Sequence, residues 1–308
     1  MTKYGYVVFQ LRAHVRSRPN EVRLLADLDG KGADTLTLAA NFLKQVQGEV
    51  LEEPRYELAH RVDKAQLFGR SIMIHGTSGP YGMLGNSVHL DTGEEQEIDE
   101  RTAMMTSMRT MLLLPQDSND GFIFCERVGA RHFKSALERL VLRPISRTLN
   151  MTYKVYAHVD AKAWSDFLET ADVREITSIY RSTRLEDVGS LRGQAKDLRI
   201  TAGGVVANRL GQKLGKVLSS LTHKEDPVAF NLDEYPDLKP GNPDNYERER
   251  LELKVGDGYT ERLIVVEREQ LPQFVYVHKD RLPDAVLRDA WIEHGNELLS
   301  VQGGTMGT

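Results

Sequence analysis

The sequence predicts an α+β fold in which amphipathic helices pack on a central, mostly antiparallel sheet, followed by a C-terminal hairpin and helix. Between residues 110 and 180 the predicted elements follow the order hairpin, helix, strand, helix, strand, which is typical of this class. A second hairpin signal is Gly256-Asp257-Gly258 between two alternating runs. The length of 308 residues is enough for one large domain or two modest ones.

The N-terminal third predicts several strands and one helix. Strands are expected over residues 4–13 and 22–26, which are rich in apolar and β-forming residues. Residues 36–46 then carry apolar side chains at helical spacing. Residues 56–75 predict one or two further strands, which lead into a glycine-rich loop.

The middle of the chain has the clearest pattern. Residues 110–114 and 121–128 flank a polar, turn-rich connection and predict a hairpin. A helix is expected from about Arg131, with Pro144 ending or kinking it. The remaining elements are predicted as a strand over 153–159, a short helix over 161–170 and a strand over 173–180.

The sequence predicts three regions along the chain. Residues 1–182 form an α+β domain. Residues 183–245 hold a basic helix, over about 205–221, and an acidic, proline-rich linker. Residues 246–308 form a β-hairpin, a helix that begins near Pro283 and a flexible tail.

Composition is that of a soluble globular protein, with 40% hydrophobic and 28% charged residues. The single cysteine, Cys125, excludes an internal disulfide and is expected to be a small core residue. The N-terminus lacks the pattern of a signal peptide, and no apolar run approaches the roughly 18 residues needed to span a bilayer. We therefore expect a cytoplasmic protein with no membrane partner.

The net charge of −5, from 40 basic and 45 acidic residues, conceals a segregation of charge along the chain. Residues 127–154 and residues 189–224 each carry a net +6. Residues 91–100 and residues 225–257 each carry a net −6. This segregation is the main indication of function in the sequence.

The two basic helices predict a groove for a polyanion, most concretely a nucleic-acid backbone, or a surface for an acidic partner protein. The arginines that step by four from Arg139 would form one helical stripe, opposite Phe133, Leu137 and Leu140. The chain would then be a non-catalytic binding or assembly protein, such as an accessory factor of bacterial antiviral defence. The candidate binding residues are Arg131, Lys134, Arg139, Arg143, Arg147, Arg209, Lys213 and Lys216.

Two alternatives to a polyanion groove also fit the charge pattern. Each basic face is typical of a solvated amphipathic helix that acidic stretches neutralise within the fold. Alternatively, the chain is a structural homo-oligomer in which residues 91–100 of one copy contact residues 131–147 of another. The negative net charge favours these two alternatives over a dedicated nucleic-acid binder.

A glycine-rich loop is predicted at residues 76–85, where glycine recurs at every third position. Glycine permits positive φ and close approach of backbone N–H groups to an anion, so the loop is a candidate anion site. The spacing does not match a P-loop or a dinucleotide-binding fingerprint, and a flexible loop or lid is the alternative. The glycines concerned are Gly76, Gly79, Gly82 and Gly85.

Pro243-Asp244 followed by Glu252-Leu253-Lys254 resembles the Pro-Asp … (Asp/Glu)-x-Lys signature of restriction-endonuclease-like nucleases. The resemblance implies Mg²⁺ held by Asp244 and Glu252, with Lys254 positioning the attacking water. A metal-dependent nuclease is therefore the alternative function, and the sequence does not decide whether the chain is an enzyme. Outside this motif no cofactor or metal is expected, because the nine histidines are scattered and only one cysteine exists.

Overall fold

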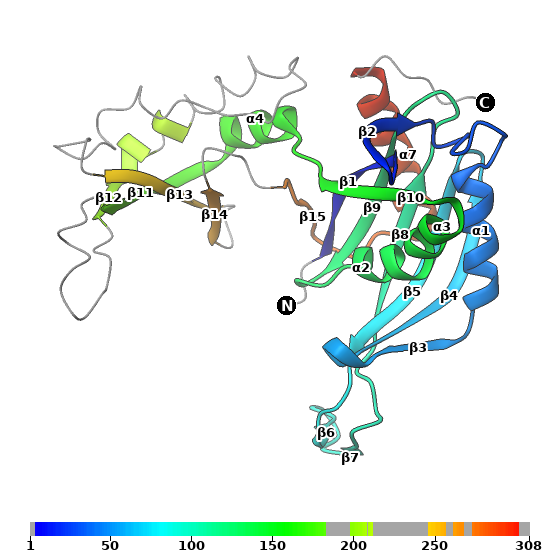
Figure 1. Cartoon of the computed structure of the whole chain (residues 1–308). Coiled ribbons are helices and arrows are strands. Elements are labelled where there is room, and N and C mark those ends of the chain that lie inside the picture. Colours follow the sequence, from blue (N-terminus) through cyan, green and yellow to red (C-terminus); the bar gives the residue numbers. More distant parts are fainter. Residues whose placement is uncertain are drawn as a thin grey trace. The chain divides into compact units, whose positions relative to one another are not determined.

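The computed structural model describes residues 4–182, 198–207, 209–211, 246–256, 261–267 and 273–301 (Figure 1). The chain forms two compact units. Unit 1 comprises Met1–His158 and Val275–Thr308, and unit 2 comprises Val159–Phe274. These boundaries differ from the expected ones at residues 182 and 245, and the C-terminal hairpin and helix belong to different units.

Unit 1 is built on a nine-stranded sheet whose named strands all pair antiparallel. The main path runs β10-β1-β9-β8-β5-β4-β3, and β2 and β15 also pair with β1. The strands are β1 (Tyr4–Val15), β2 (Arg18–Arg23), β3 (Val50–Glu53), β4 (Leu58–Phe68), β5 (Ser71–Pro80), β8 (Thr106–Leu113), β9 (Asp120–Val128), β10 (Met151–Ala157) and β15 (Tyr276–His278). A single 3₁₀ turn, η1 (Pro54–Tyr56), joins β3 to β4.

The sheet buries both of its faces. Successive side chains of a strand point to opposite faces, so Val7 and Phe9 of β1 enter one core whereas Tyr6 and Val8 enter the other. The first core is covered by α1 (Thr35–Val46) and by a helical segment over residues 134–149, and the second by α7 (Asp284–Val301). Cys125 is fully buried in the first core, and this burial raises the pKa of its thiol to about 12, which makes it unreactive.

The helical segment consists of α2 (Lys134–Leu137), a π-helical turn η2 (Glu138–Leu142) and α3 (Arg143–Leu149). Pro144 explains the π turn, because its nitrogen cannot donate to the carbonyl of Leu140. The N–H of Arg143 donates instead to the carbonyl of Glu138, five residues earlier. The helix therefore begins three residues later than expected and continues through Pro144.

The C-terminal segment completes unit 1, although it follows unit 2 in the sequence. β15 pairs with the first residues of β1. Trp291 of α7 is fully buried and stacks against Phe124 of β9, with ring centroids 6.0 Å apart. Burial of such a large aromatic surface accounts for the docking of α7.

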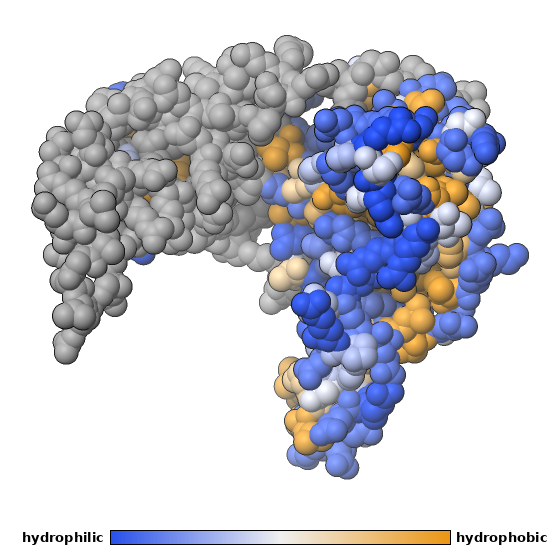
Figure 2. Space-filling view, in the orientation of Figure 1, coloured by the Kyte–Doolittle hydropathy of each residue, from blue (hydrophilic) through white to orange (hydrophobic). Residues whose placement is uncertain are grey.

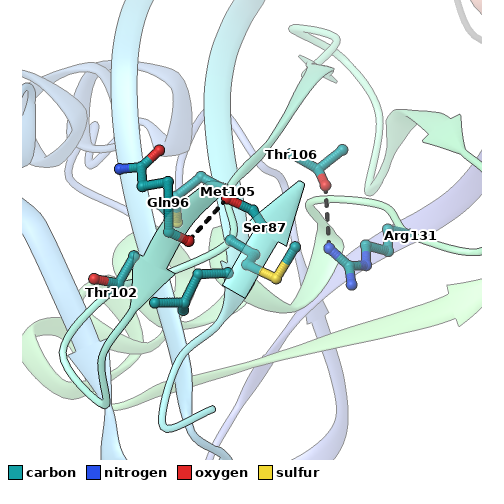
Figure 3. Close-up of a pocket in the computed structure, with 8 residues that line it drawn as sticks. Ser87, Gln96, Thr102, Met105, Thr106 and Arg131 are labelled. Carbon is teal, nitrogen blue, oxygen red and sulfur yellow. Dashed lines mark hydrogen bonds between the residues drawn. The ribbon is translucent and has the colours of Figure 1, made fainter. Parts of the chain in front are cut away.

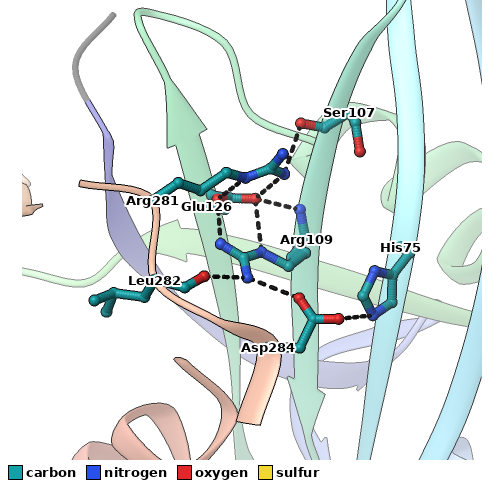
Figure 4. A network of polar contacts seen from close by, with 7 residues as sticks. All are labelled: His75, Ser107, Arg109, Glu126, Arg281, Leu282 and Asp284. Atoms are coloured by element: carbon teal, nitrogen blue, oxygen red, sulfur yellow. Dashed lines mark hydrogen bonds and ion pairs between the residues drawn. The ribbon is translucent and has the colours of Figure 1, made fainter. Parts of the chain in front are cut away.

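A buried ion cluster attaches this segment to the sheet (Figure 4). Arg109 of β8 and Glu126 of β9 form an ion pair whose side chains are only 5% and 3% exposed. Arg281 binds the same carboxylate at 2.9 Å. Arg109 also donates to the carbonyl of Leu282 at 2.7 Å and to the carboxylate of Asp284 at 2.8 Å.

A short hairpin projects from unit 1 beyond the end of β5 (Figures 1 and 2). Its strands, β6 (Gly85–Val88) and β7 (Glu95–Ile98), form a separate two-stranded sheet. We call residues 81–105, which carry it, the finger.

Unit 2 contains an antiparallel sheet of order β12-β11-β13-β14 and the helix α4 (Ala161–Thr170). The strands are β11 (Asp172–Ser182), β12 (Leu198–Gly203), β13 (Tyr246–Gly256) and β14 (Glu261–Glu267). Of the predicted helix over 205–221, the structure describes the start, where Ala207 and Leu210 are buried and Val206 is 46% exposed.

Antiparallel sheets and helices share the chain, so the mixed class predicted from the sequence is confirmed in that coarse form. The second strand lies earlier than predicted, at Arg18–Arg23 instead of residues 22–26. The predicted tail and the proline-rich part of the linker lie outside the described residues. Within the described ranges, no helix has the length and apolar character needed to span a membrane.

Candidate anion-binding site

A pocket of about 210 Å³ lies between the helical segment and the sheet edge formed by β3 and β4. Three arginines of the predicted stripe line it: Arg139 in η2 and Arg143 and Arg147 in α3. Leu140, expected on the opposite face of the helix, lines the same pocket. The π turn explains this change, because it adds a residue to one turn and rotates the later residues about the helix axis.

The carboxylates of the pocket already have arginine partners. Glu53 of β3 forms an ion pair with Arg139, whose guanidinium also lies over the ring of Tyr56 at 4.8 Å. Glu52 forms an ion pair with Arg101. The two acids therefore do not neutralise the other arginines of the pocket.

Arg143 and Arg147 are both exposed and lie one turn apart on α3. In the part of the chain that the structure describes, neither forms an ion pair or a side-chain hydrogen bond. Their guanidinium groups are thus solvated cations beside a pocket, which is the form in which arginine is best prepared to bind an external anion.

His60 of β4 lies at the back of the pocket and is almost fully buried. Burial lowers the pKa of its imidazole, so the ring is neutral near pH 7. Its Nδ1 lies 2.8 Å from the hydroxyl of Ser78, and its Nε2 lies 3.4 Å from the carboxylate of Glu53. A neutral ring satisfies both contacts by accepting from Ser78 and donating to Glu53, which holds that carboxylate toward Arg139.

His60, Ser78 and Glu53 were not predicted as site residues. Glu53, His60 and Ser78 contact one another in the order carboxylate, histidine, serine, which is the order of a catalytic triad, but Ser78 does not line the pocket. We therefore assign these three residues a positioning role, in which they orient the carboxylate that binds Arg139. The sequence shows only that His60 lies in a segment that is predicted to form a strand. The position of His60 opposite Ser78 comes from the pairing of β4 with β5.

Two further residues of the predicted basic surface lie elsewhere. Arg131 donates to the hydroxyl of Thr106 at 3.1 Å and lines a different pocket, of about 340 Å³, at the base of the finger (Figure 3). Lys134 is half-buried, forms an ion pair with Glu138 at 3.0 Å and lies over the ring of Phe9. Neither residue belongs to the arginine stripe as it folds.

The second basic helix lies in unit 2. Arg209 is exposed there, whereas Lys213 and Lys216 lie outside the described residues. A groove formed jointly by the two basic helices stays a prediction, because the helices belong to different units.

Gly76 and Gly79 lie within β5 and not in a loop, so the predicted glycine loop is shorter than expected. A Cβ on Gly76 would lie 2.5 Å from the ring of Phe133, and one on Gly79 would lie 1.8 Å from the carbonyl oxygen of Met104. These glycines permit close packing of the sheet against its neighbours. Gly76 and Gly79 therefore lie in the packed sheet and do not form part of a loop around an anion.

The other two glycines of the predicted loop come after β5. Gly82 has a φ of 82°, which favours glycine, and a Cβ there would lie 3.5 Å from the carboxylate carbon of Glu57. Gly85 is the first residue of β6, and a Cβ added there would have no atom within 4 Å. A carboxylate beside Gly82 disfavours an anion at this position.

The nuclease signature is only partly described. Glu252 of β13 lies opposite Thr177 of β11, and Lys254 of β13 forms an ion pair with Glu175 of β11 at 2.7 Å. Asp244 lies outside the described residues. No group of three potential metal ligands occurs among the residues that the structure describes, and the nuclease stays a prediction.

Fold and site together define a protein of antiparallel sheets and helices with an arginine-lined pocket at a sheet edge. No known family model matches the chain, and a search among curated proteins found no match.

Proposed function

We propose that the chain is a non-catalytic binding protein whose pocket engages a polyanion, most concretely the phosphate backbone of a nucleic acid. The observation that supports this is the pair Arg143 and Arg147, two exposed cations beside a pocket whose carboxylates are bound to other arginines. A role as an accessory factor in bacterial antiviral defence is the biological setting that we expect for such a protein.

The charge balance of the pocket supports an anionic ligand. Arg139 is neutralised by Glu53, and Glu52 is neutralised by Arg101 outside the stripe. His60 is neutral near pH 7 because burial lowers its pKa. Arg143 and Arg147 therefore give the pocket two uncompensated positive charges.

Geometry favours phosphate as the anion. Each guanidinium presents a planar fork of donors that can bind two phosphate oxygens at once. The arginines are separated by one helical turn, a rise of about 6 Å, so one strand can engage both through separate phosphates. Two such contacts give weak binding without sequence preference, as expected for a component that acts within an assembly.

The test is fluorescence anisotropy with a short labelled oligonucleotide between about 50 and 200 mM salt. Wild type should bind at the lower salt concentration and release the oligonucleotide at the higher one. Arg143→Gln combined with Arg147→Gln should weaken binding and reduce the slope of log affinity against log salt by about 2, since two phosphate contacts are lost.

The matched control is Lys31→Gln combined with Lys64→Gln, which removes two exposed cations of unit 1 that do not line the pocket. It should leave the salt slope unchanged. Failure of wild type to bind at low salt, or an equal loss in both double variants, contradicts the proposal.

A further inference from the structure

The finger has two different faces. Side chains alternate along its strands, so Ser87, Gln96 and Ile98 share one face and line the 340 Å³ pocket, in which Figure 3 labels Ser87 and Gln96. The other face carries Asn86 and Val88 of β6 with Glu97 and Glu95 opposite them. We call this second set the outer face.

The outer face is acidic and unneutralised. Glu95 accepts a hydrogen bond from Asn86 at 3.2 Å. No carboxylate between residues 91 and 100 forms an ion pair with a lysine or arginine of the described chain, although the segment carries a net −6. Fixed charges of one sign on a projecting element are typical of a surface that recognises a basic partner.

Apolar residues lie beside these carboxylates. Leu84 is 74% exposed and Leu90 is 97% exposed, and Val88 is exposed on the outer face itself. Figure 2 shows hydrophobic and hydrophilic surface side by side on the projecting finger. A partner must therefore offer apolar area as well as positive charge.

The 210 Å³ pocket lined by arginines, which we call the arginine pocket, offers both positive charge and apolar area. Beside Arg143 and Arg147, its lining includes Leu51, Leu140 and Pro144. Glu95 and Glu97 are two residues apart on one strand face, about 6.7 Å, and the arginines are one helical turn apart, about 6 Å. The two carboxylates can thus meet the two guanidinium groups in register.

We propose that the outer face of the finger of one copy binds the arginine pocket of a second copy. Within the described part of one chain these groups form no ion pair, so the complementary surfaces are available between copies. The contact joins two different surfaces, so either two copies exchange fingers reciprocally in a closed dimer or successive copies form a ring or a chain.

This inference rests on the same arginines as the proposed function and predicts a competition. The finger is an acidic mimic of the polyanion, so an oligonucleotide and a second copy cannot occupy Arg143 and Arg147 together. By linkage, oligonucleotide binding dissociates the assembly, and high salt weakens both interactions.

The experiment measures mass in solution by multi-angle light scattering at low and high salt. Wild type should exceed the mass of one chain at low salt and approach it at high salt. Glu95→Lys with Glu97→Lys should have the mass of one chain at both. The control Glu94→Lys with Glu100→Lys changes the net charge equally but keeps the outer face, so it should behave like wild type.

A charge swap identifies the contact. Arg143→Glu with Arg147→Glu should also fail to associate alone. Mixed with the Glu95→Lys, Glu97→Lys variant, it should restore a larger species, because each surface again meets its opposite charge. No larger species in the mixture overturns the proposal, as does a wild type with the mass of one chain at low salt.

The finger variant also separates this inference from the proposed function. It retains Arg143 and Arg147, so it should still bind the labelled oligonucleotide. If this variant binds the oligonucleotide but the wild type never self-associates, only the finger contact is overturned. If the wild type self-associates and both charge-reversed variants do not, but no variant binds the oligonucleotide, only the polyanion proposal is overturned.

Discussion

Unit 1 uses arginine in two opposite ways. Arg109 is buried against Glu126 and is further held by Asp284 and a backbone carbonyl (Figure 4). Arg143 and Arg147 are exposed and have no carboxylate partner in the described chain. The first arrangement fixes the C-terminal segment to the sheet, and the second leaves charge available to a ligand.

The difference arises from the free energy of desolvation. A guanidinium that leaves water must recover its lost hydration from paired and hydrogen-bonded groups, so a buried arginine is fully partnered. An exposed arginine keeps its hydration and can exchange it for an anion at little cost. Burial therefore distinguishes the arginines that hold the fold together from the arginines that stay available to a ligand.

The largest expected effect comes from breaking the buried cluster. Glu126→Gln leaves Arg109 and Arg281 facing a neutral amide, and we expect the free energy of unfolding to fall by about 3–5 kcal/mol. The measurement is urea unfolding at pH 7. Oligonucleotide binding by the folded variant should be unchanged, since Glu126 does not line the arginine pocket.

Glu21 provides the matched control. It also binds two arginines, Arg18 at 2.7 Å and Arg23 at 2.6 Å, but all three side chains are at least 30% exposed. Glu21→Gln should therefore cost no more than about 1 kcal/mol. Equal losses for Glu21→Gln and Glu126→Gln would show that burial does not distinguish the two kinds of arginine.

The sequence contained part of this distinction. Arginines stepping by four predicted a stripe, and Arg139, Arg143 and Arg147 do line one pocket. A charged residue inside an apolar strand, such as Arg109 before Met111–Leu114, is the local signal that a buried partner exists. The identity of that partner is not local, because Glu126 comes from the next strand and Asp284 from the far end of the chain.

Several features depend on long-range packing and could not be predicted. Proline inside a helix usually breaks it, yet the helix continues past Pro144 because a π turn accommodates the missing donor. Gly76 and Gly79 fit a loop by composition, but their neighbours Phe133 and Met104 come from other elements. The pocket wall from β3 likewise depends on pairing with β4.

Acid should weaken the buried cluster before it alters the exposed arginines. Burial alone would raise the pKa of Glu126, but hydrogen bonds from Arg109 and Arg281 outweigh it and hold the pKa below the ordinary value of 4.5. A carboxyl whose pKa is lowered by folding stabilises the protein above its unfolded pKa and loses that contribution as pH falls through its folded pKa. The difference in the free energy of unfolding between wild type and Glu126→Gln should therefore become smaller below about pH 4.5. Urea unfolding at a series of pH values measures this difference. A difference that grows on acidification contradicts a lowered pKa for Glu126.

The smallest effect is expected at the edge of the cluster. Asp284 binds Arg109 at 2.8 Å, but its side chain is 64% exposed, and Arg109 keeps Glu126 and the carbonyl of Leu282 when it is lost. Asp284→Asn should lower the free energy of unfolding by less than about 1 kcal/mol, part of it from the lost charge at the first turn of α7. Urea unfolding at low and high salt tests this, because an exposed ion pair is screened whereas the Glu126 pair is not. A loss as large as that of Glu126→Gln would mean that the accessible carboxylate, and not the buried one, attaches the C-terminal segment to the sheet.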